Sequence, residues 1–91
     1  MVVSYQNHYN ARLNKCFYLQ TVNTYPKNKA ENVHEDGVLF DINDNREYGN
    51  FHRMMNYEGP YDPVPVICNL LERQCHSRVE WEYLVRPYME E

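Results

Sequence analysis

The sequence predicts one α+β domain over residues 1–91: a small antiparallel sheet of three or four strands, with a C-terminal amphipathic helix packed on it and a short N-terminal helix. A chain of 91 residues suits a single domain, because domains cluster near about 100–150 residues. The middle of the chain alternates apolar and polar residues, as half-buried strands do. The C-terminal part changes to the helical spacing of apolar residues. Strands followed by a helix are typical of the α+β class.

The first predicted element is a short helix over Ser4–Asn14, with Ser4 as its N-cap. Its apolar face holds three residues at positions i, i+4 and i+8, which are Tyr5, Tyr9 and Leu13. The next element is a strand over Cys16–Val22, because this run is β-branched and aromatic. A solvated loop is expected over residues 25–30.

A β-hairpin is predicted over Val38–Phe51, where Asp44 and Asn45 supply turn chemistry between two alternating runs. The turn predicts a register that pairs Ile42 with Glu47, Phe40 with Gly49 and Val38 with Phe51. One face of the hairpin then carries four apolar residues and is the predicted core face: Val38, Phe40, Ile42 and Phe51. The other face is more polar and carries Leu39, Asp41, Tyr48 and Asn50.

The last predicted element is the C-terminal helix, which begins with a capping box formed by Ser77 and Glu80. An apolar stripe follows at positions i, i+3, i+4 and i+7, namely Trp81, Leu84, Val85 and Tyr88. We therefore expect Trp81 to be buried against the sheet. Pro87 is expected to end or kink the helix near its last turn. Residues 64–71, before the helix, fit a short strand or one helical turn equally well.

Charge is distributed unevenly along the chain. The net charge is −4, which argues against nucleic-acid and anionic-membrane binding, because both call for a basic surface. Residues 1–30 carry four basic side chains and no acid, a net +4, whereas residues 31–91 carry five arginines and thirteen acids, a net −8. The basic third either lies across the acidic remainder of the fold or forms a patch, including Arg12 and Lys15, that recognises an acidic partner.

The three cysteines leave two interpretations open. Cys68 and Cys75 are separated by six residues, so they either form a local disulfide or stay reduced. The disulfide would contribute about 2.5 kcal/mol by chain-entropy arithmetic and would require an oxidising compartment. Cys16 begins an apolar run and is expected to be a buried, inert thiol.

Neither a metal site nor a cofactor is predicted. The four histidines are His8, His34, His52 and His76. Neither they nor the cysteines show the tight ligand pairs of zinc sites, and no nucleotide-binding or hydrolase motif occurs. The apolar runs are also shorter than the roughly 18 residues of a membrane span.

Tyr57 and Tyr61 lie on a segment stiffened by proline and glycine. Tyrosine is enriched at interfaces and loses little conformational entropy there, so this segment is a candidate contact surface. The alternative is that both rings fold down over the sheet and extend a thin core.

Three stretches together resemble a known group: Tyr9–Phe17, Asp41–Phe51 and Cys75–Glu90. They are similar to a group of small uncharacterised bacterial domains, many of them exported or lipoprotein-like. The resemblance implies a periplasmic or secreted protein with paired cysteines, and it supplies no activity. Because Met1 and the residues after it lack the features of a signal peptide, we expect either a cytoplasmic protein or one whose export signal has been removed.

The sequence therefore predicts a small non-catalytic binding or protein-interaction module. A protein partner or a second copy of the chain is expected, and the candidate surfaces are the Tyr57–Tyr61 segment and the basic residues Arg12 and Lys15. The alternatives are a small enzyme or metal-dependent protein that uses histidines and carboxylates, and a structural subunit of an oligomer. A cleft with convergent polar groups and shifted pKa values would favour the enzyme, and a flat exposed aromatic patch would favour the module.

Overall fold

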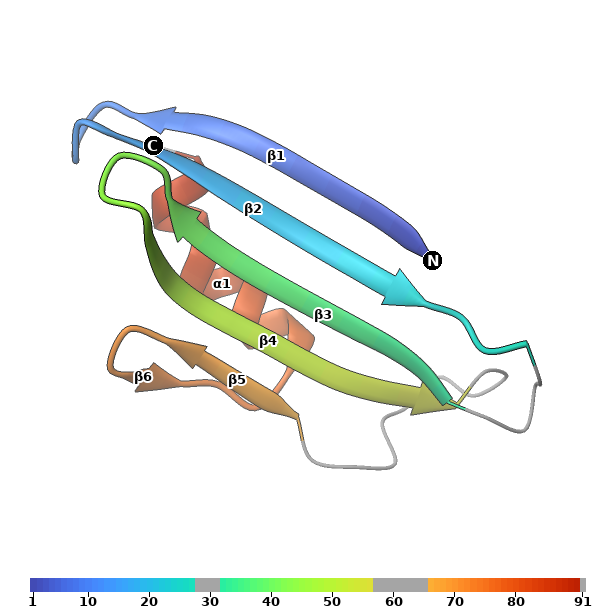
Figure 1. The fold of residues 1–91 in the computed structure, drawn as a ribbon. Coiled ribbons are helices and arrows are strands. Elements are labelled where there is room, and N and C mark those ends of the chain that lie inside the picture. Colours follow the sequence, from blue (N-terminus) through green and yellow to red (C-terminus); the bar gives the residue numbers. More distant parts are fainter. Residues whose placement is uncertain (28–31, 57–65, 91) are drawn as a thin grey trace.

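The computed structural model describes residues 1–27, 32–56 and 66–90, and the strands within them form one sheet with a helix on one face (Figure 1). The elements are β1 (Val2–Asn10), β2 (Lys15–Thr24), β3 (Asn32–Asp41), β4 (Arg46–Asn56), β5 (Ile67–Leu70), β6 (Arg73–Gln74) and α1 (Arg78–Met89). The six strands pair antiparallel in chain order, from β1 at one edge to β6 at the other. In Figure 1, α1 lies behind the sheet, and the near face of the sheet is open.

The α+β class is correct, but the predicted sheet of three or four strands and the predicted N-terminal helix are wrong. Residues 2–10 form the edge strand β1, which pairs with β2 from Val2 opposite Asn23 to Asn10 opposite Lys15. A spacing of four residues places Tyr5 and Tyr9 on one face of a helix, and it also places them on one face of a strand. The spacing alone therefore does not separate a helix from a strand, and the hydrogen-bonded pairing with β2 shows that the segment is a strand. The predicted strand over residues 16–22 is confirmed as part of β2.

The β3–β4 hairpin is present, but its predicted register and core face are wrong. Phe40 pairs with Glu47, and a β-bulge then shifts the register so that Leu39 pairs with Gly49 and Gly37 with Phe51. Because side chains alternate along a strand, this shift places Leu39 on the same face as Phe51. Leu39 is fully buried. Val38 and Phe40 lie on the open face, and Ile42 is exposed in the turn.

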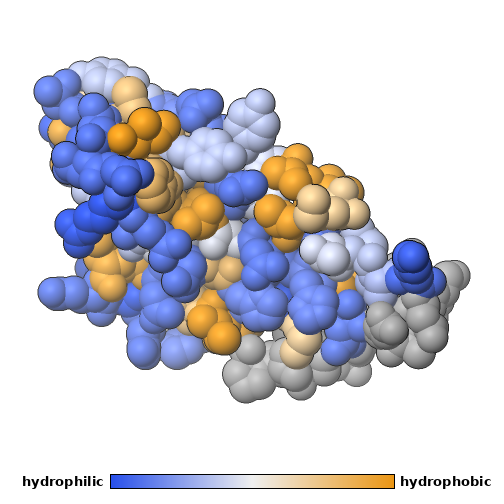
Figure 2. Space-filling model, in the orientation of Figure 1, coloured by the Kyte–Doolittle hydropathy of each residue, from blue (hydrophilic) through white to orange (hydrophobic). Residues whose placement is uncertain are grey.

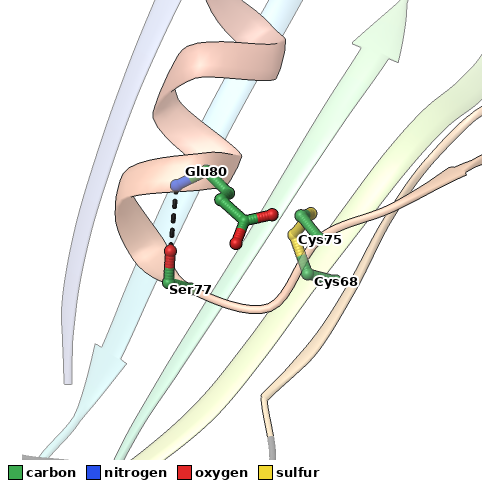
Figure 3. Close-up of a disulfide and its surroundings, with 4 residues drawn as sticks. All are labelled: Cys68, Cys75, Ser77 and Glu80. Atoms are coloured by element: carbon green, nitrogen blue, oxygen red, sulfur yellow. Dashed lines mark hydrogen bonds between the residues drawn. A yellow bond between two sulfur atoms is a disulfide. The ribbon is translucent and has the colours of Figure 1, made fainter.

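The C-terminal helix is confirmed together with its N-cap. The Ser77 hydroxyl accepts a hydrogen bond from the Glu80 N–H at 3.1 Å (Figure 3). As predicted, Trp81 is buried: it is 3% exposed, and its ring stacks on Phe51 with centroids 5.9 Å apart. The indole also lies against the bare backbone of Gly37, where an added Cβ would stand 3.3 Å from the indole nitrogen. The helix continues past Pro87 to Met89.

The undecided segment 64–71 contains strand β5. Cys68 on β5 lies at disulfide distance from Cys75, with Cα atoms 4.9 Å apart (Figure 3). The Cys75 N–H also donates to the Cys68 carbonyl at 2.9 Å. Both cysteines are buried in the core beside Leu70, so this link ties the end of the sheet to the start of α1.

A buried carboxylate fixes the start of α1 to the sheet. Glu35 on β3 is 4% exposed, and each of its oxygens accepts from an arginine. Arg53 on β4 donates its Nε–H to one oxygen at 2.7 Å, and Arg78, the first residue of α1, donates to the other. Buried charges of this kind are stable when they are paired and fully hydrogen-bonded. The ion pairs therefore orient α1 across the sheet.

Candidate functional site

Two adjoining hollows lie around the C-terminal half of α1, with volumes of about 750 and 630 Å³. They share three lining residues, Leu70, Arg73 and Tyr88. The larger hollow lies along β4 and the β5–β6 hairpin, and the smaller one lies along α1. We refer to the smaller hollow as the arginine groove and define it by Arg12, Arg73, Tyr83, Arg86 and Tyr88.

One buried side chain places Arg12 at the groove. Asn10, at the end of β1, is fully buried. Its amide nitrogen donates to the carbonyls of Pro87 at 2.9 Å and Tyr88 at 3.3 Å. These carbonyls are in the last turn of α1, where helix carbonyls lack partners within the helix. The Asn10 amide oxygen accepts from the Leu13 N–H at 2.9 Å, so the β1–β2 turn that carries Arg12 is fastened to the end of the helix.

The floor at Tyr88 is an aromatic cluster with fixed geometry. The rings of Phe17, Tyr48 and Tyr88 make three edge-to-face contacts, with centroids 5.2 to 5.6 Å apart. Such contacts are favourable beyond the area they bury. Tyr83, five residues earlier on α1, is 67% exposed. The groove therefore combines a rigid ring with a second, accessible tyrosine.

The arginine groove is positively charged although the protein as a whole is acidic. Its lining contains three arginines and one acid, Glu90. The Arg86 Nε lies 3.4 Å from a Glu90 carboxylate oxygen, and both side chains are largely exposed. Arg73 makes no ion pair within residues 1–27, 32–56 and 66–90. A guanidinium group such as that of Arg73 binds carboxylates through paired hydrogen bonds, so this surface suits an acidic ligand.

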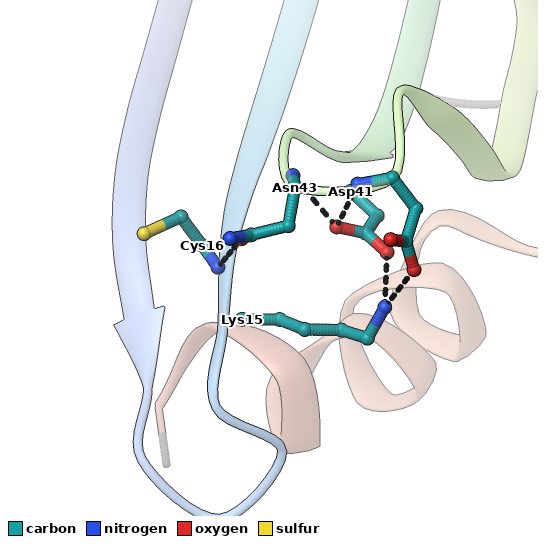
Figure 4. A network of polar contacts seen from close by, with 5 residues as sticks. Lys15, Cys16, Asp41 and Asn43 are labelled. Atoms are coloured by element: carbon teal, nitrogen blue, oxygen red, sulfur yellow. Dashed lines mark hydrogen bonds and ion pairs between the residues drawn. The ribbon is translucent and has the colours of Figure 1, made fainter.

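Of the predicted site residues, the structure places Arg12 at the groove and Lys15 elsewhere. Lys15 bonds through its ammonium group to Asp41 at 2.7 Å and to Asp44 (Figure 4). Two of its hydrogen bonds are thus made within the fold. Tyr57 and Tyr61 lie outside the described residues.

The Lys15 pair holds the β3–β4 turn to β2. Burial alone would raise the pKa of the Asp41 carboxyl, but the hydrogen bond from Lys15 and those from the Asp44 and Asn43 N–H groups lower it below its ordinary value. The hydrogen bond that the Lys15 ammonium donates to Asp41, and then the one that it donates to Asp44, raise the pKa of Lys15. The Asn43 side chain completes the corner by accepting from the Cys16 N–H at 2.6 Å (Figure 4).

We expect Asp41→Asn to lower the free energy of unfolding at neutral pH by about 2 kcal/mol, because it removes the charge-assisted hydrogen bond between buried Asp41 and partly exposed Lys15. Since the folded-state pKa of Asp41 is lowered, this stabilisation is present above the ordinary pKa of 3.8 and is lost as pH falls through the folded value. Urea unfolding should therefore show the difference between wild type and variant shrinking in acid. Asp44→Asn, at a largely exposed partner, should change stability by less than about 1 kcal/mol. A difference that stays constant down to acid pH would contradict the ion-pair interpretation.

His34 and His52 lie together, away from Cys16. His52 Nδ1 lies 2.6 Å from an Asp36 carboxylate oxygen, and the His34 ring lies beside His52 with centroids 5.7 Å apart. Cys16 belongs to the opposite end of β2 from the residues that face His34. Within the described part of the chain, no three histidine, cysteine, aspartate or glutamate side chains are placed to hold a metal ion.

The open face of the sheet exposes tyrosine and aliphatic side chains. Figure 2 views this face, where hydrophobic atoms are exposed among polar ones. Tyr5 on β1 and Tyr18 on β2 lie together, with ring centroids 5.8 Å apart. Val3 and Tyr9 on β1 and Ile67 on β5 are also exposed. This aromatic face adjoins the β1 edge.

Comparisons with protein-family models, curated proteins and solved structures found no match. The resemblance to small exported bacterial domains therefore stays a prediction. Among the described residues, no helix has the length and apolar character needed to cross a membrane.

Sequence reasoning did not identify Arg73, Tyr83, Arg86 or Tyr88 as site residues. A partial signal was present in α1, where Tyr83, Arg86 and Glu90 recur at positions i, i+3 and i+7 and so share one exposed helix face. Tyr88 fell on the predicted core stripe, and the structure shows that it serves both the core and the groove. No sequence pattern marks Arg73 as a site residue, because its place in the groove depends on how the β5–β6 hairpin packs beside α1.

Proposed function

We propose that the protein is a non-catalytic binding module that holds an acidic segment of a partner protein in the arginine groove. The observation that carries this proposal is the convergence of three arginines and two tyrosines on one hollow of a protein whose net charge is −4. A local charge of opposite sign to the whole molecule orients and selects ligands. Arginine and tyrosine are also the residues most enriched at binding hot spots.

The lining of the groove indicates what kind of segment fits. Leu84, which is only partly buried, supplies an apolar contact between the charged residues. Tyr83 and Tyr88 each offer a ring face and a hydroxyl group. A short peptide that alternates acidic and apolar side chains would place carboxylates against the guanidinium groups and an apolar group against Leu84. Because the arginines are exposed to solvent, we expect moderate affinity with strong salt dependence.

The shifted pKa values support binding rather than catalysis. Shifted groups often mark catalytic sites, but among the described residues they belong to internal ion pairs. Asp41 and Lys15 neutralise each other at the β3–β4 turn, and Arg78 is held by Glu35 and Glu82. These three residues do not line the arginine groove. Their pKa shifts therefore come from ion pairs that stabilise the fold.

A defined peptide tests the proposal. The probe is a short fluorescein-labelled peptide of glutamate, leucine and glycine, and its control carries glutamine in place of glutamate. We expect fluorescence anisotropy to show binding of the acidic peptide, with the glutamine peptide weaker by about tenfold or more. Binding should also weaken as salt rises from about 50 to 300 mM, because screening shortens the reach of the charges.

Two matched double variants locate the binding. Arg73→Gln with Arg86→Gln removes two exposed charges from the groove and should weaken binding of the acidic peptide by about tenfold. Gln20→Glu with Asn7→Asp makes the same change in net charge on the open face of the sheet and should leave binding nearly unchanged. Equal weakening by both variants would mean that only net charge matters, and it would overturn the proposed site.

A further inference from the structure

Strand β1 is a long, unprotected edge of the sheet. It has nine residues and pairs with β2 without a bulge, and its other side meets no strand among the described residues. All of its residues except His8 and Asn10 are exposed. An edge strand presents a row of unpaired N–H and C=O groups, and natural sheets usually block such an edge with charge, proline or a bulge. β1 has none of these devices.

The composition of β1 is unusual among the long strands of this sheet. Its sequence, VVSYQNHYN, contains no aspartate, glutamate, lysine or arginine. β2, β3 and β4 each contain at least one charged residue. These inner strands are already paired on both sides. The one long strand with a free side is β1, and it lacks the charges that would prevent a further strand from pairing with it.

The opposite edge of the sheet is blocked. Strand β6 has only two residues, Arg73 and Gln74. The chain turns away directly after it, at Cys75, which is tied to Cys68. A sheet with one open edge can be extended once, so pairing between two copies closes after two chains.

We propose that two copies of the chain pair along β1, antiparallel and about a two-fold axis, so that their six-stranded sheets join into one. An uncharged edge has no charge that could attract a charged segment. The strand that best fits it is itself uncharged and β-prone, and β1 of a second copy is such a strand. In a two-fold interface each residue meets the same surface of its copy, and the absence of charge in β1 removes like-charge pairs in every register.

The interface would satisfy about eight to ten backbone hydrogen bonds along the nine residues of β1. It would also join the two open faces, so that exposed side chains of β1 such as Val3, Tyr5 and Tyr9 meet a neighbouring strand. The arginine groove lies on the helix-bearing side around α1, and it approaches β1 only at Arg12 in the β1–β2 turn. Pairing along β1 and peptide binding in the groove therefore use different residues.

Sedimentation velocity over a range of concentrations tests this interface. We expect the wild-type chain to pass from monomer to dimer as concentration rises. Gln6→Lys with Asn7→Lys places two charges near the middle of β1. Each lysine then has lysines of the second copy as cross-strand neighbours, and this repulsion should raise the dimer dissociation constant by about tenfold or more. Gln20→Lys with Asn50→Lys makes the same charge change on inner strands and should leave it within about twofold.

Hydrogen exchange supplies a second readout that does not depend on a variant. In the monomer, alternate amides of β1 point away from β2 and should exchange rapidly, and in the dimer these amides should become protected as concentration rises. Far-UV circular dichroism shows whether each variant keeps its sheet. A wild-type chain that stays monomeric would overturn the proposal. So would a dimer that tolerates the two lysines in β1 and leaves the outward amides of β1 unprotected.

Discussion

Trp81→Ala is expected to lower the free energy of unfolding by about 3–5 kcal/mol, the range for large aromatic residues removed from a core. Trp81 is 3% exposed, stacks on Phe51 and lies against Gly37, so its loss opens a cavity where α1 meets the centre of the sheet. Domains are stable by only about 5–15 kcal/mol, and a chain this short lies toward the lower end. Urea unfolding followed by far-UV circular dichroism measures the effect.

Val79→Ala is the matched control, because Val79 lies on the same helix and is 74% exposed. It should change stability by less than about 0.5 kcal/mol. The wild-type protein should also show blue-shifted tryptophan emission that iodide quenches poorly. If Trp81→Ala and Val79→Ala had equal effects, or if the emission were red-shifted and readily quenched, α1 would be a detachable arm rather than part of the core.

Leu39→Ala is expected to lower the free energy of unfolding by about 2–5 kcal/mol, more than Phe40→Ala. Leu39 is fully buried between the sheet and α1. Phe40 is partly exposed on the open face, so its truncation should cost only about 1–2 kcal/mol. This order is opposite to the one that the predicted core face implies, so the pair of variants tests the β-bulge directly.

The same urea titration compares the two variants. A larger loss for Phe40→Ala would mean that the hairpin keeps the register predicted from its turn, without the bulge. Equal losses would mean that the open face is covered in solution, for example by a second copy. Only a clear excess for Leu39→Ala agrees with the described register.

The helix α1 could be predicted because its signals are local. Ser77 and Glu80 form the cap within one turn, and the apolar spacing that follows fits only a helix. The β3–β4 turn was also predictable from Asp44 and Asn45. Both elements are specified by residues within a few positions of each other, so no knowledge of the remaining fold was needed.

Strand β1 was missed although its turn carried a usable signal. The turn after β1 runs from Asn10 to Asn14, and the turn after β3 runs from Asp41 to Asn45. In both turns the first side chain accepts N–H bonds from the turn, and the last residue has a φ near 54°. This matching spacing of Asx residues would have predicted a second hairpin, because Asn and Asp favour such turns.

The bulge and the arginine groove could not be predicted, for a shared reason. Leu39 and Asp41 were assigned to the more polar face because Asp41 is charged, but Lys15 on another strand neutralises it. Likewise, Arg73 reaches the groove only because the β5–β6 hairpin packs beside α1. Both features depend on contacts between segments that are distant in the sequence.

The most direct test of the arginine groove is an NMR titration of the isotope-labelled protein with the acidic peptide. We expect shift changes that saturate and that gather at Arg12, Arg73, Tyr83, Arg86 and Tyr88, while the amides around Tyr5 and Tyr18 on the open face stay in place. Shift changes centred on the open face, or none at any peptide concentration, would contradict a binding module built around the groove.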